Sequence, residues 1–490
     1  MKWNFRKTYK KMPPAVRSSL WFSICNFMQR GIALITIPVF TRLLTTEEYG
    51  VCNVYFAWAE MILVFTSLQI PYEGLNNGLI RYEKDKDGYT SAMAGLILVM
   101  TVLGAGIYFL IHSWLDPVMG LNPMLIGLMF IQLLFNPMLM LWMNRERFDF
   151  HYRMPAAVML LNTALNPILS ILLVLHTPLR AEARVIGSVA GQSFLGFLVL
   201  LILFRKGKTF YRKEYWKFAV SFNLPLLFYY LSQLVLNQSD RVMINYYEGS
   251  GKAAVYSMAY TAAAIIKLLV SAINGSFMPW IYRKLKKKSY YEIRQLVSIL
   301  CLIIAAGTLA VSAFAPDLLR IMATEEYSEA IWIIPPVSAS VFFIFLYTLF
   351  AGMEMYYDEN KGIPFISVIC SSANLLLNAV FIPRYGYMAA GWTTLACYAA
   401  MTVLHSLLLR NVFGKKEIQD PPVSAKLLLA VSFGVLVMTF LILGIYRLGP
   451  FRYLIPVLES GVLFVFRKNL LLIIQRKEGA DTGENEAGEN

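Results

Sequence analysis

The sequence predicts an all-α integral membrane protein, with two halves of six transmembrane helices followed by two further helices. Its 490 residues are 58% hydrophobic and 15% charged, and the mean hydropathy is +0.56. A soluble domain carries about 25% charged residues. Apolar windows of about 20 residues, which cross a bilayer as a helix, are centred near residues 30, 63, 100, 132, 166, 194, 229, 266, 303, 342, 373, 400, 435 and 462. These windows are helices because lipid offers no hydrogen-bond partner to an unpaired backbone.

The basic residues predict the orientation of these helices. Of the 44 Lys and Arg residues, 33 fall in loops on one side and 8 in loops on the other. Cytoplasmic loops carry the excess of Lys and Arg, so both termini are expected in the cytoplasm. Basic clusters at 2–17, 205–217 and 283–288 are topology anchors in this interpretation. The net charge of +14 therefore requires no nucleic-acid partner.

A weak internal repeat predicts the domain organisation. Asn162 and Asn166 lie four residues apart in the fifth span, and Asn374 and Asn378 lie four apart in the eleventh. Two six-helix halves of the same orientation explain this echo, and a substrate site then forms between them. Chance similarity between apolar helices stays an alternative. The predicted regions are an N-terminal lobe at 1–205, a C-terminal lobe at 206–414, helices 13 and 14 at 415–477, and a disordered acidic tail at 478–490.

Polar residues line up on one face of several predicted helices. Residues three, four and seven apart share a helix face. The aligned sets are Ser23, Asn26 and Arg30 in the first span, Asn53 and Glu60 in the second, Gln233, Asn237, Asp240 and Arg241 in the seventh, Tyr256, Tyr260, Lys267, Ser271 and Asn274 in the eighth, and Ser367, Ser371, Asn374 and Asn378 in the eleventh. A charge at a helix centre costs about 2.5 to 3.5 kcal/mol in lipid, so the stripes predict the walls of a polar cavity.

Three other interpretations of the stripes stay open. The serines and asparagines also serve as hydrogen-bonding packing residues between helices in many membrane proteins. Arg30 and Glu60 could instead form a dry ion pair. Asp240 and Arg241 could lie at the outer end of their helix and snorkel to the interface.

The charged residues of the stripes favour an anionic ligand, since three cations (Arg30, Arg241 and Lys267) face two carboxylates (Glu60 and Asp240). Guanidinium groups match phosphate oxygens especially well. The sequence contains no P-loop, no H-E-x-x-H, no G-x-S-x-G and no carboxylate cluster with metal spacing. The five cysteines show no C-x-x-C spacing. We therefore expect no enzyme, no metal site and no cofactor.

Four segments carry a family resemblance. They are IPVFTRLLTTEEYG at 37–50, GLNNGLIRY at 74–82, SDRVMI at 239–244 with VYS at 255–257, and APDLLR at 315–320 with EYSEA at 326–330. In this order they resemble the Wzx-like polysaccharide flippases of the multidrug/oligosaccharidyl-lipid/polysaccharide superfamily. The resemblance implies two six-helix bundles that form a V-shaped cavity, with two extra C-terminal helices.

The resemblance also implies a function. Such a protein moves an undecaprenyl-pyrophosphate-linked oligosaccharide repeat unit across the bacterial cytoplasmic (inner) membrane by alternating access. Arg30 would contact the pyrophosphate, Arg241 and Lys267 would add positive potential, and Glu60 would tune Arg30 or carry a coupling proton. Asn26, Asn237 and Asn374 are further expected substrate contacts, and Asp240 is an expected coupling or ion-pair residue.

The partners expected from the resemblance are the lipid-linked glycan, the bilayer, a coupling cation and a polysaccharide polymerase. The alternative is a cation-coupled multidrug antiporter of the same superfamily. Such antiporters use acidic residues in the N-terminal half, where this chain has Glu60 and Glu73.

Overall fold

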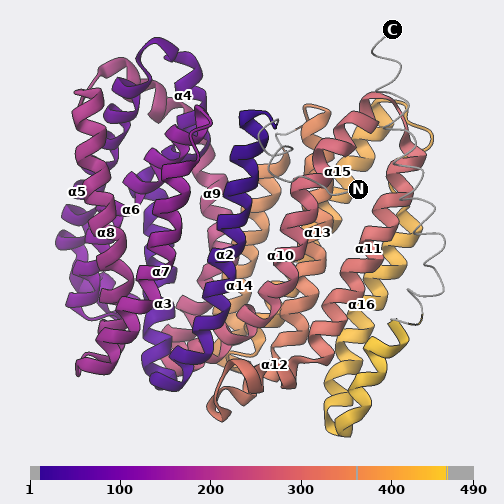
Figure 1. Cartoon of the computed structure of the whole chain (residues 1–490). Coiled ribbons are helices and arrows are strands. Elements are labelled where there is room, and N and C mark those ends of the chain that lie inside the picture. The colour runs from indigo at the N-terminus through magenta and orange to yellow at the C-terminus, as the bar shows by residue number, and fades with distance from the viewer. Residues whose placement is uncertain (1–11, 360–361, 460, 462–490) are drawn as a thin grey trace, which may run out of the picture. The chain divides into compact units, whose positions relative to one another are not determined.

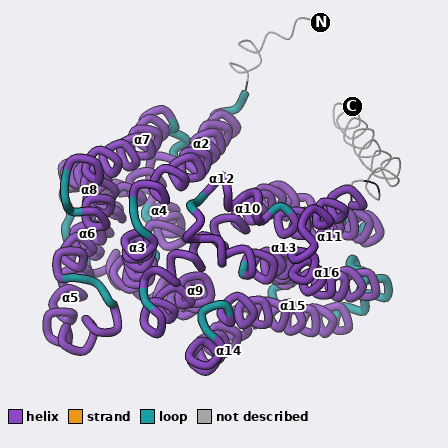
Figure 2. The backbone as a smooth tube through the Cα atoms, turned by 90° about the horizontal axis from the view of Figure 1, so that it is seen from below, coloured by secondary structure: helices purple, strands orange, loops and turns teal. Residues whose placement is uncertain are grey.

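The computed structural model describes residues 12–359, 362–459 and 461, and within these ranges it contains helices and no strand. The first long helices are α2 (Pro14–Leu43), α3 (Thr46–Ser67), α5 (Lys86–Met119), α6 (Pro123–Phe148), α7 (Arg153–His176), α8 (Arg180–Gly207) and α9 (Lys213–Glu248). The others are α10 (Ser250–Lys286), α11 (Tyr290–Ala313), α13 (Ile334–Tyr356), α14 (Gly362–Tyr385), α15 (Ala389–Lys415) and α16 (Ala425–Ile445). Short helices are η1 (Ile70–Gly74), α4 (Leu75–Arg81), η2 (Glu83–Asp85), α12 (Ala315–Met322), η3 (Glu325–Trp332) and η4 (Tyr446–Tyr453). Figure 1 labels most of them, and Figure 2 shows the short loops that join them.

The all-α membrane fold is confirmed. Within the described ranges, 13 helices are long and apolar enough to cross a membrane. Large apolar side chains on them point outward, such as Leu110 and Trp114, which are 84% and 85% exposed. Exposed apolar surface on this scale suits lipid rather than water. The predicted fourteenth span, centred near residue 462, lies largely outside the described residues.

Contacts between helices divide the chain into two units. The first ends at Val255 and also includes Met322–Glu326, and the second contains Tyr256–Ile321 and the chain from Tyr327 onward. The division falls after α9, not at residue 205, because α9 packs against α3 and α5 of the first unit. The two predicted lobes, 1–205 and 206–414, were inferred from an internal repeat. Contacts between helices do not test a repeat, so these lobes stay a prediction.

The segment between α2 and α3 is fixed by a helix cap. The Thr45 hydroxyl accepts a hydrogen bond from the Glu48 amide at 3.2 Å, and the Glu48 carboxylate accepts one from the Thr45 amide at 2.9 Å. This reciprocal capping box satisfies two amides that the first turn of a helix leaves unpaired. Gly50 follows in the first turns of α3, where an added Cβ would lie 1.8 Å from the carbonyl oxygen of Ser250. The motif therefore starts a helix and lets the backbone of Ser250 approach it.

A break separates α3 from α4. Leu68 and Gln69 adopt left-handed φ angles of 47° and 53°, which side chains other than glycine adopt at a cost. The glycines that follow leave room for neighbouring side chains. An added Cβ at Gly74 would lie 2.3 Å from the amide nitrogen of Asn223, and one at Gly78 would lie 2.0 Å from the ring of Tyr89. Residues Leu75–Arg81 therefore form a separate short helix, α4, which packs on α5 and α9.

Candidate functional site

A carboxylate, an amide and a guanidinium form a hydrogen-bonded chain inside the first unit. The Gln238 side-chain amide donates to the Glu60 carboxylate, and its carbonyl oxygen accepts from the Arg241 guanidinium. The same guanidinium donates to the backbone oxygen of Asn237 at 3.0 Å. Glu60 belongs to α3 and the other residues to α9, and these two helices pack together. A neutral amide thus connects one acidic and one basic stripe residue.

Gln238 was missed by the sequence analysis, although a signal for it existed. It lies three residues before Arg241, on the same helix face. The predicted stripe of the seventh span follows the spacing of Gln233, Asn237 and Asp240, and Gln238 lies outside that spacing. Gln238 matters because its amide can donate to a carboxylate and accept from a guanidinium at the same time.

Arg30 does not pair with Glu60 in this structure. The Arg30 side chain is exposed, and within residues 12–359, 362–459 and 461 no hydrogen bond or ion pair of its guanidinium is found. The exposed carboxylate of Glu60 is bonded to Gln238 instead. The dry Arg30–Glu60 ion pair is therefore not formed here, and the guanidinium is available to a ligand or to water.

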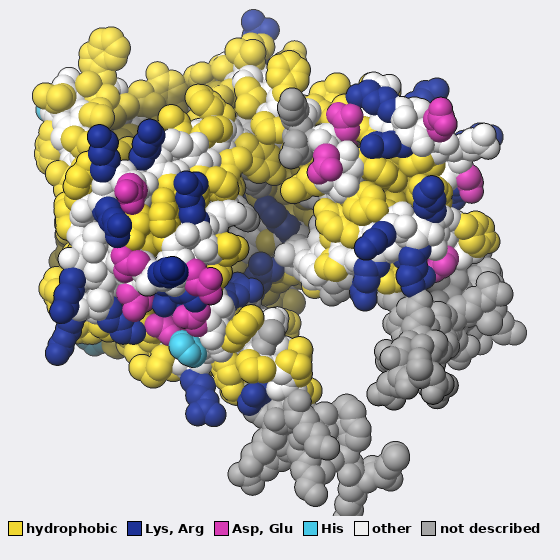
Figure 3. Space-filling view, turned by 90° about the horizontal axis from the view of Figure 1, so that it is seen from above, with side chains coloured by type: hydrophobic (Ala, Val, Ile, Leu, Met, Phe, Trp, Pro, Cys, Tyr) yellow, Lys and Arg dark blue, Asp and Glu magenta, His cyan; other side chains and the backbone are white. Residues whose placement is uncertain are grey.

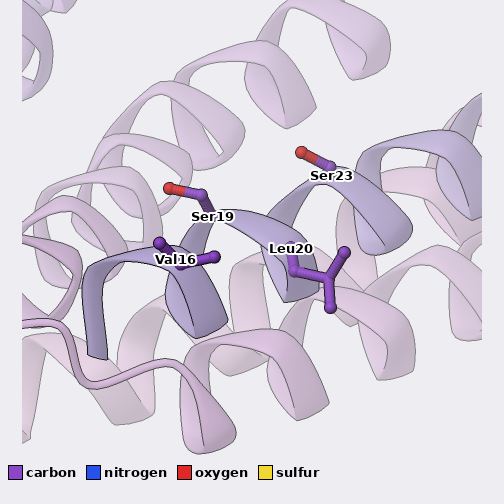
Figure 4. A pocket seen from close by; sticks show the side chains of 4 residues that line it. All are labelled: Val16, Ser19, Leu20 and Ser23. Carbon is purple, nitrogen blue, oxygen red and sulfur yellow. The ribbon is translucent and has the colours of Figure 1, made fainter. Parts of the chain in front are cut away.

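The polar face of α2 that carries Arg30 also borders a pocket. Val16, Ser19, Leu20 and Ser23 line a shallow, open hollow of about 400 Å³. Figure 4 shows the Ser19 and Ser23 hydroxyls on the same side of the helix. Asn26 is exposed, like Arg30. The predicted stripe on the first span is thus an accessible polar face.

The carboxylate and the guanidinium of the α9 stripe differ in exposure. Asp240 is fully buried and Arg241 is half-buried. Asn237 donates to the Gln233 backbone oxygen at 2.7 Å. Arg241 lies about two turns before Glu248, the last residue of α9. Burial of Asp240 and the inward hydrogen bonds of Arg241 disfavour snorkelling at the helix end.

In the second unit, the predicted cation lies on an accessible face of α10. The Lys267 side chain is exposed. Asn274, two turns further along, donates to the Thr348 hydroxyl of α13 at 3.1 Å. Tyr256 is fully buried with its ring centroid 5.2 Å from that of Tyr260. The α10 stripe therefore divides into a buried aromatic end and an exposed basic centre.

The paired asparagines of the repeat join neighbouring helices. Asn374 and Asn378 of α14 are both fully buried. Asn374 donates to the Thr394 hydroxyl of α15 at 3.3 Å, and the Thr393 hydroxyl donates to Asn378. In the first unit, Asn166 of α7 accepts from the Ser188 hydroxyl of α8 at 2.9 Å. Asn374 could meet a substrate only after α14 and α15 separate, so its predicted substrate role requires a rearrangement.

A charged network covers one end of the first unit, where Figure 3 shows Lys, Arg, Asp and Glu side chains interleaved. Asp149 accepts from Arg145 at 2.5 Å and from Lys86 at 3.0 Å, and Arg145 also pairs with Asp87 at 3.0 Å. Partial burial raises the pKa of the Asp149 carboxyl, but the hydrogen bonds and charges of Arg145 and Lys86 outweigh it and hold that pKa below its ordinary value. The network ties the first turn of α5 to the last turn of α6.

A buried polar pair in the second unit was not predicted from the sequence. Glu354 of α13 and His405 of α15 are both fully buried, and His405 Nδ1 lies 3.0 and 3.1 Å from the two carboxylate oxygens. A signal existed on α15, where Thr394, Tyr398, Thr402 and His405 follow helical spacings of four, four and three residues. No group of His, Cys, Asp and Glu suited to a metal is found among the residues that the structure describes.

Comparison with solved structures defines the fold. A lipid II flippase, MurJ, in an inward closed conformation matches with a TM-score of 0.69 at 14% identity, over 92% of this chain and 100% of that chain. An inward-facing multidrug resistance MATE transporter of the MOP superfamily matches with a TM-score of 0.60 at 13% identity, over 80% and 96%. The fold is thus that of flippases and multidrug transporters.

The family follows from the sequence. Residues 15–285, more than half of the chain, match the model of the family described as polysaccharide biosynthesis protein, and the chain belongs to that family. An uncharacterised membrane protein of Haemophilus influenzae is 20% identical over 396 residues, 76% of this chain and 94% of that protein. The family resemblance inferred from the four sequence segments is confirmed.

Proposed function

We propose that this protein is a flippase that moves undecaprenyl-pyrophosphate-linked oligosaccharide repeat units across the bacterial cytoplasmic membrane. Membership of the polysaccharide biosynthesis family and the MurJ-like fold support a flippase. The observation that carries the choice of an anionic lipid-linked substrate is Arg30. Its guanidinium is exposed on a membrane-length helix and has no partner among the described residues.

An unpaired guanidinium in a membrane is expensive and tends to mark a pathway. A pyrophosphate would satisfy it with bidentate, charge-assisted hydrogen bonds. Asn26, four residues before Arg30 and also exposed, offers an amide to the same ligand. We infer that the pyrophosphate contacts this face of α2 and that Arg241, Asn237 and Lys267 contribute to the transport path.

The proposed cycle is alternating access without nucleotide hydrolysis. The head group crosses along polar side chains while the lipid tail stays in the bilayer. The excess of Lys and Arg in alternate loops supports cytoplasmic termini. No catalytic step is assigned, because the product is chemically the substrate on the other side of the membrane.

One observation favours the second candidate, a cation-coupled multidrug antiporter. Glu60 is exposed in the N-terminal half and is bonded to a neutral amide rather than to a cation. A carboxylate in that state can take up a proton or a cation. In an antiporter, removal of the Glu60 carboxylate would abolish drug export but would leave surface glycan unchanged.

The test uses a strain that lacks the chromosomal gene and expresses variants from a plasmid. Arg30→Gln removes the charge, Arg30→Lys keeps it without the fork, and Arg410→Gln, at an exposed position of α15, is the matched control. We expect Arg30→Gln to lower surface polysaccharide at least tenfold, Arg30→Lys to lower it less, and Arg410→Gln to have no effect.

Membrane insertion and size-exclusion profiles establish that each variant is folded. Normal polysaccharide export by a well-inserted Arg30→Gln variant would refute the role of Arg30. Altered drug sensitivity with unchanged polysaccharide in the deletion strain would support the antiporter instead.

A further inference from the structure

Glu354 and His405 form a fully buried polar contact in the second unit. Both side chains are 0% exposed. His405 Nδ1 meets the carboxylate at 3.0 Å, whereas His405 Nε2 is buried without a hydrogen-bond partner in the part of the chain that the structure describes. Buried polar atoms are normally satisfied. A pair that served only to hold α13 and α15 together would not need a second ring nitrogen that is buried without a hydrogen bond.

Aromatic rings lie beside the pair. The ring of Tyr347 stacks on His405 with centroids 6.0 Å apart, and Tyr398 stacks on the other side of that tyrosine. Glu354 and His405 form no further ion pair or side-chain hydrogen bond among the described residues. The cysteines of the neighbouring helices are buried (Cys301 on α11, Cys370 on α14, Cys397 on α15), and Tyr282 of α10 contacts Tyr356. Charged residues also occur on these helices, among them Glu292 and Arg294 on α11, Arg384 on α14, Arg410 and Lys415 on α15, Lys426 on α16, and Lys267, Arg283, Lys284 and Lys286 on α10, but none of them bonds to Glu354 or His405 among the described residues.

Protonation decides the net charge of this site. When Nδ1–H donates to the ionised Glu354 carboxylate, Nε2 carries a lone pair and the site has one net negative charge. A proton that adds to this lone pair breaks no bond, forms an imidazolium and makes the site neutral. Burial strongly disfavours an uncompensated charge. Exchange of this proton therefore requires that water reach the closed site.

We propose that Glu354 and His405 form a one-proton binding site whose proton is taken up and released during the transport cycle. The location supports exchange with the aqueous phase, since Glu354 lies two residues before the end of α13. A change in the packing of α13 against α15 would expose the pair. The proposal deepens the proposed function, because it names a proton as the coupling ligand and its site in the second unit.

The first experiment detects the proton directly. His112, His151 and His176 are replaced by Gln in the full chain, which leaves His405 as the single imidazole. ¹⁵N NMR of labelled histidine in bilayers then follows its protonation from about pH 5 to 9. We expect a reversible change between neutral imidazole and imidazolium, and a different pH dependence of that change in the Glu354→Gln variant. One unchanging protonation state in the folded protein would overturn the proposal.

The second experiment tests coupling to transport. Proteoliposomes carry a fluorescently labelled undecaprenyl-pyrophosphate disaccharide, and its flipping is measured with and without a pH difference of about one unit across the membrane. We expect a severalfold change of rate in the parent and none in the Glu354→Gln/His405→Gln variant, whose amides retain a neutral hydrogen bond. The exchanged variant Glu354→His/His405→Glu should recover the response.

The outcomes separate the two hypotheses. If the parent does not flip the probe, the proposed function fails, while the NMR titration still judges the proton site. If the parent flips the probe and the folded double-amide variant keeps the full response to the pH difference, coupling through this pair is refuted. Monodisperse size-exclusion profiles of the double-amide and exchanged variants establish that they are folded.

Discussion

Replacement of Gly187 by Ala should destabilise the first unit, because α7 and α8 approach each other there at backbone distance. An added Cβ would lie 2.3 Å from both the Cα and the N of Ser170. Ordinary Cβ contacts begin at 3.4 Å, so the helices must separate by about 1 Å. The Ser170 hydroxyl also donates to the Arg184 backbone oxygen at 3.0 Å, which resists this separation.

The magnitude follows from two opposing effects. Overpacking of a well-packed contact costs about 1 to 3 kcal/mol, and Ala gains up to about 1 kcal/mol over Gly in a helix interior. Because the added Cβ clashes with backbone atoms, which cannot rotate away, the cost lies in the upper part of this range, about 2 to 3 kcal/mol, and the net loss is about 1 to 2 kcal/mol. For a unit of this size it corresponds to a Tm lower by about 2 to 8 °C.

Thermal unfolding in detergent, followed by tryptophan fluorescence, measures the change. Gly127→Ala is the matched control, since nothing lies within 4 Å of an added Cβ there, and its Tm should stay equal or rise slightly. Gly391→Ala should have an intermediate effect, because its nearest contact is the Ile333 side chain at 3.2 Å. Equal Tm values for the Gly187 and Gly127 variants would refute this reasoning.

Three further predictions concern charge and cysteine chemistry. Asp149→Asn should lower the free energy of unfolding by about 1 to 2 kcal/mol at neutral pH. Because the folded-state pKa of Asp149 is depressed, the contribution of its carboxylate to stability is full above the unfolded-state pKa of about 4 and is lost as the pH falls through the folded-state value. The Tm values of the variant and the parent should therefore converge in acid. Lys415→Ala removes an exposed ion pair with Glu359 and should change the free energy of unfolding by less than about 0.5 kcal/mol at 25 °C. A larger loss would contradict the low energy expected for an exposed ion pair. All five cysteines are free and buried, so mass spectrometry should find little maleimide labelling of the folded protein and five labels after unfolding.

The local features of the chain followed from the sequence. Apolar windows located the 13 long helices, and Thr45 and Glu48 of the sequence motif form the cap of α3. The break at Leu68 and Gln69 was not predicted, because neither residue is a Gly or a Pro. Tertiary packing stabilises the left-handed angles there, and no local pattern reports it.

The candidate sites were predicted only in part. The stripes identified Glu60 and Arg241, which the structure joins through Gln238. They also suggested a pair between Arg30 and Glu60, which the described structure does not contain. The pair of Glu354 and His405 was not predicted, since polar spacing along one helix does not reveal a partner 51 positions away on another helix.

The sequence by itself determined that this is a helical membrane protein of the polysaccharide biosynthesis family, and which helix faces are polar. Helix formation and facial periodicity depend on residues within a few positions of one another, and the membrane sets the helix length. Only the tertiary structure decided which polar groups meet. Hydrogen bonds extend about 3 Å, so a small rotation of α3 or α9 decides whether Glu60 meets an amide or a guanidinium.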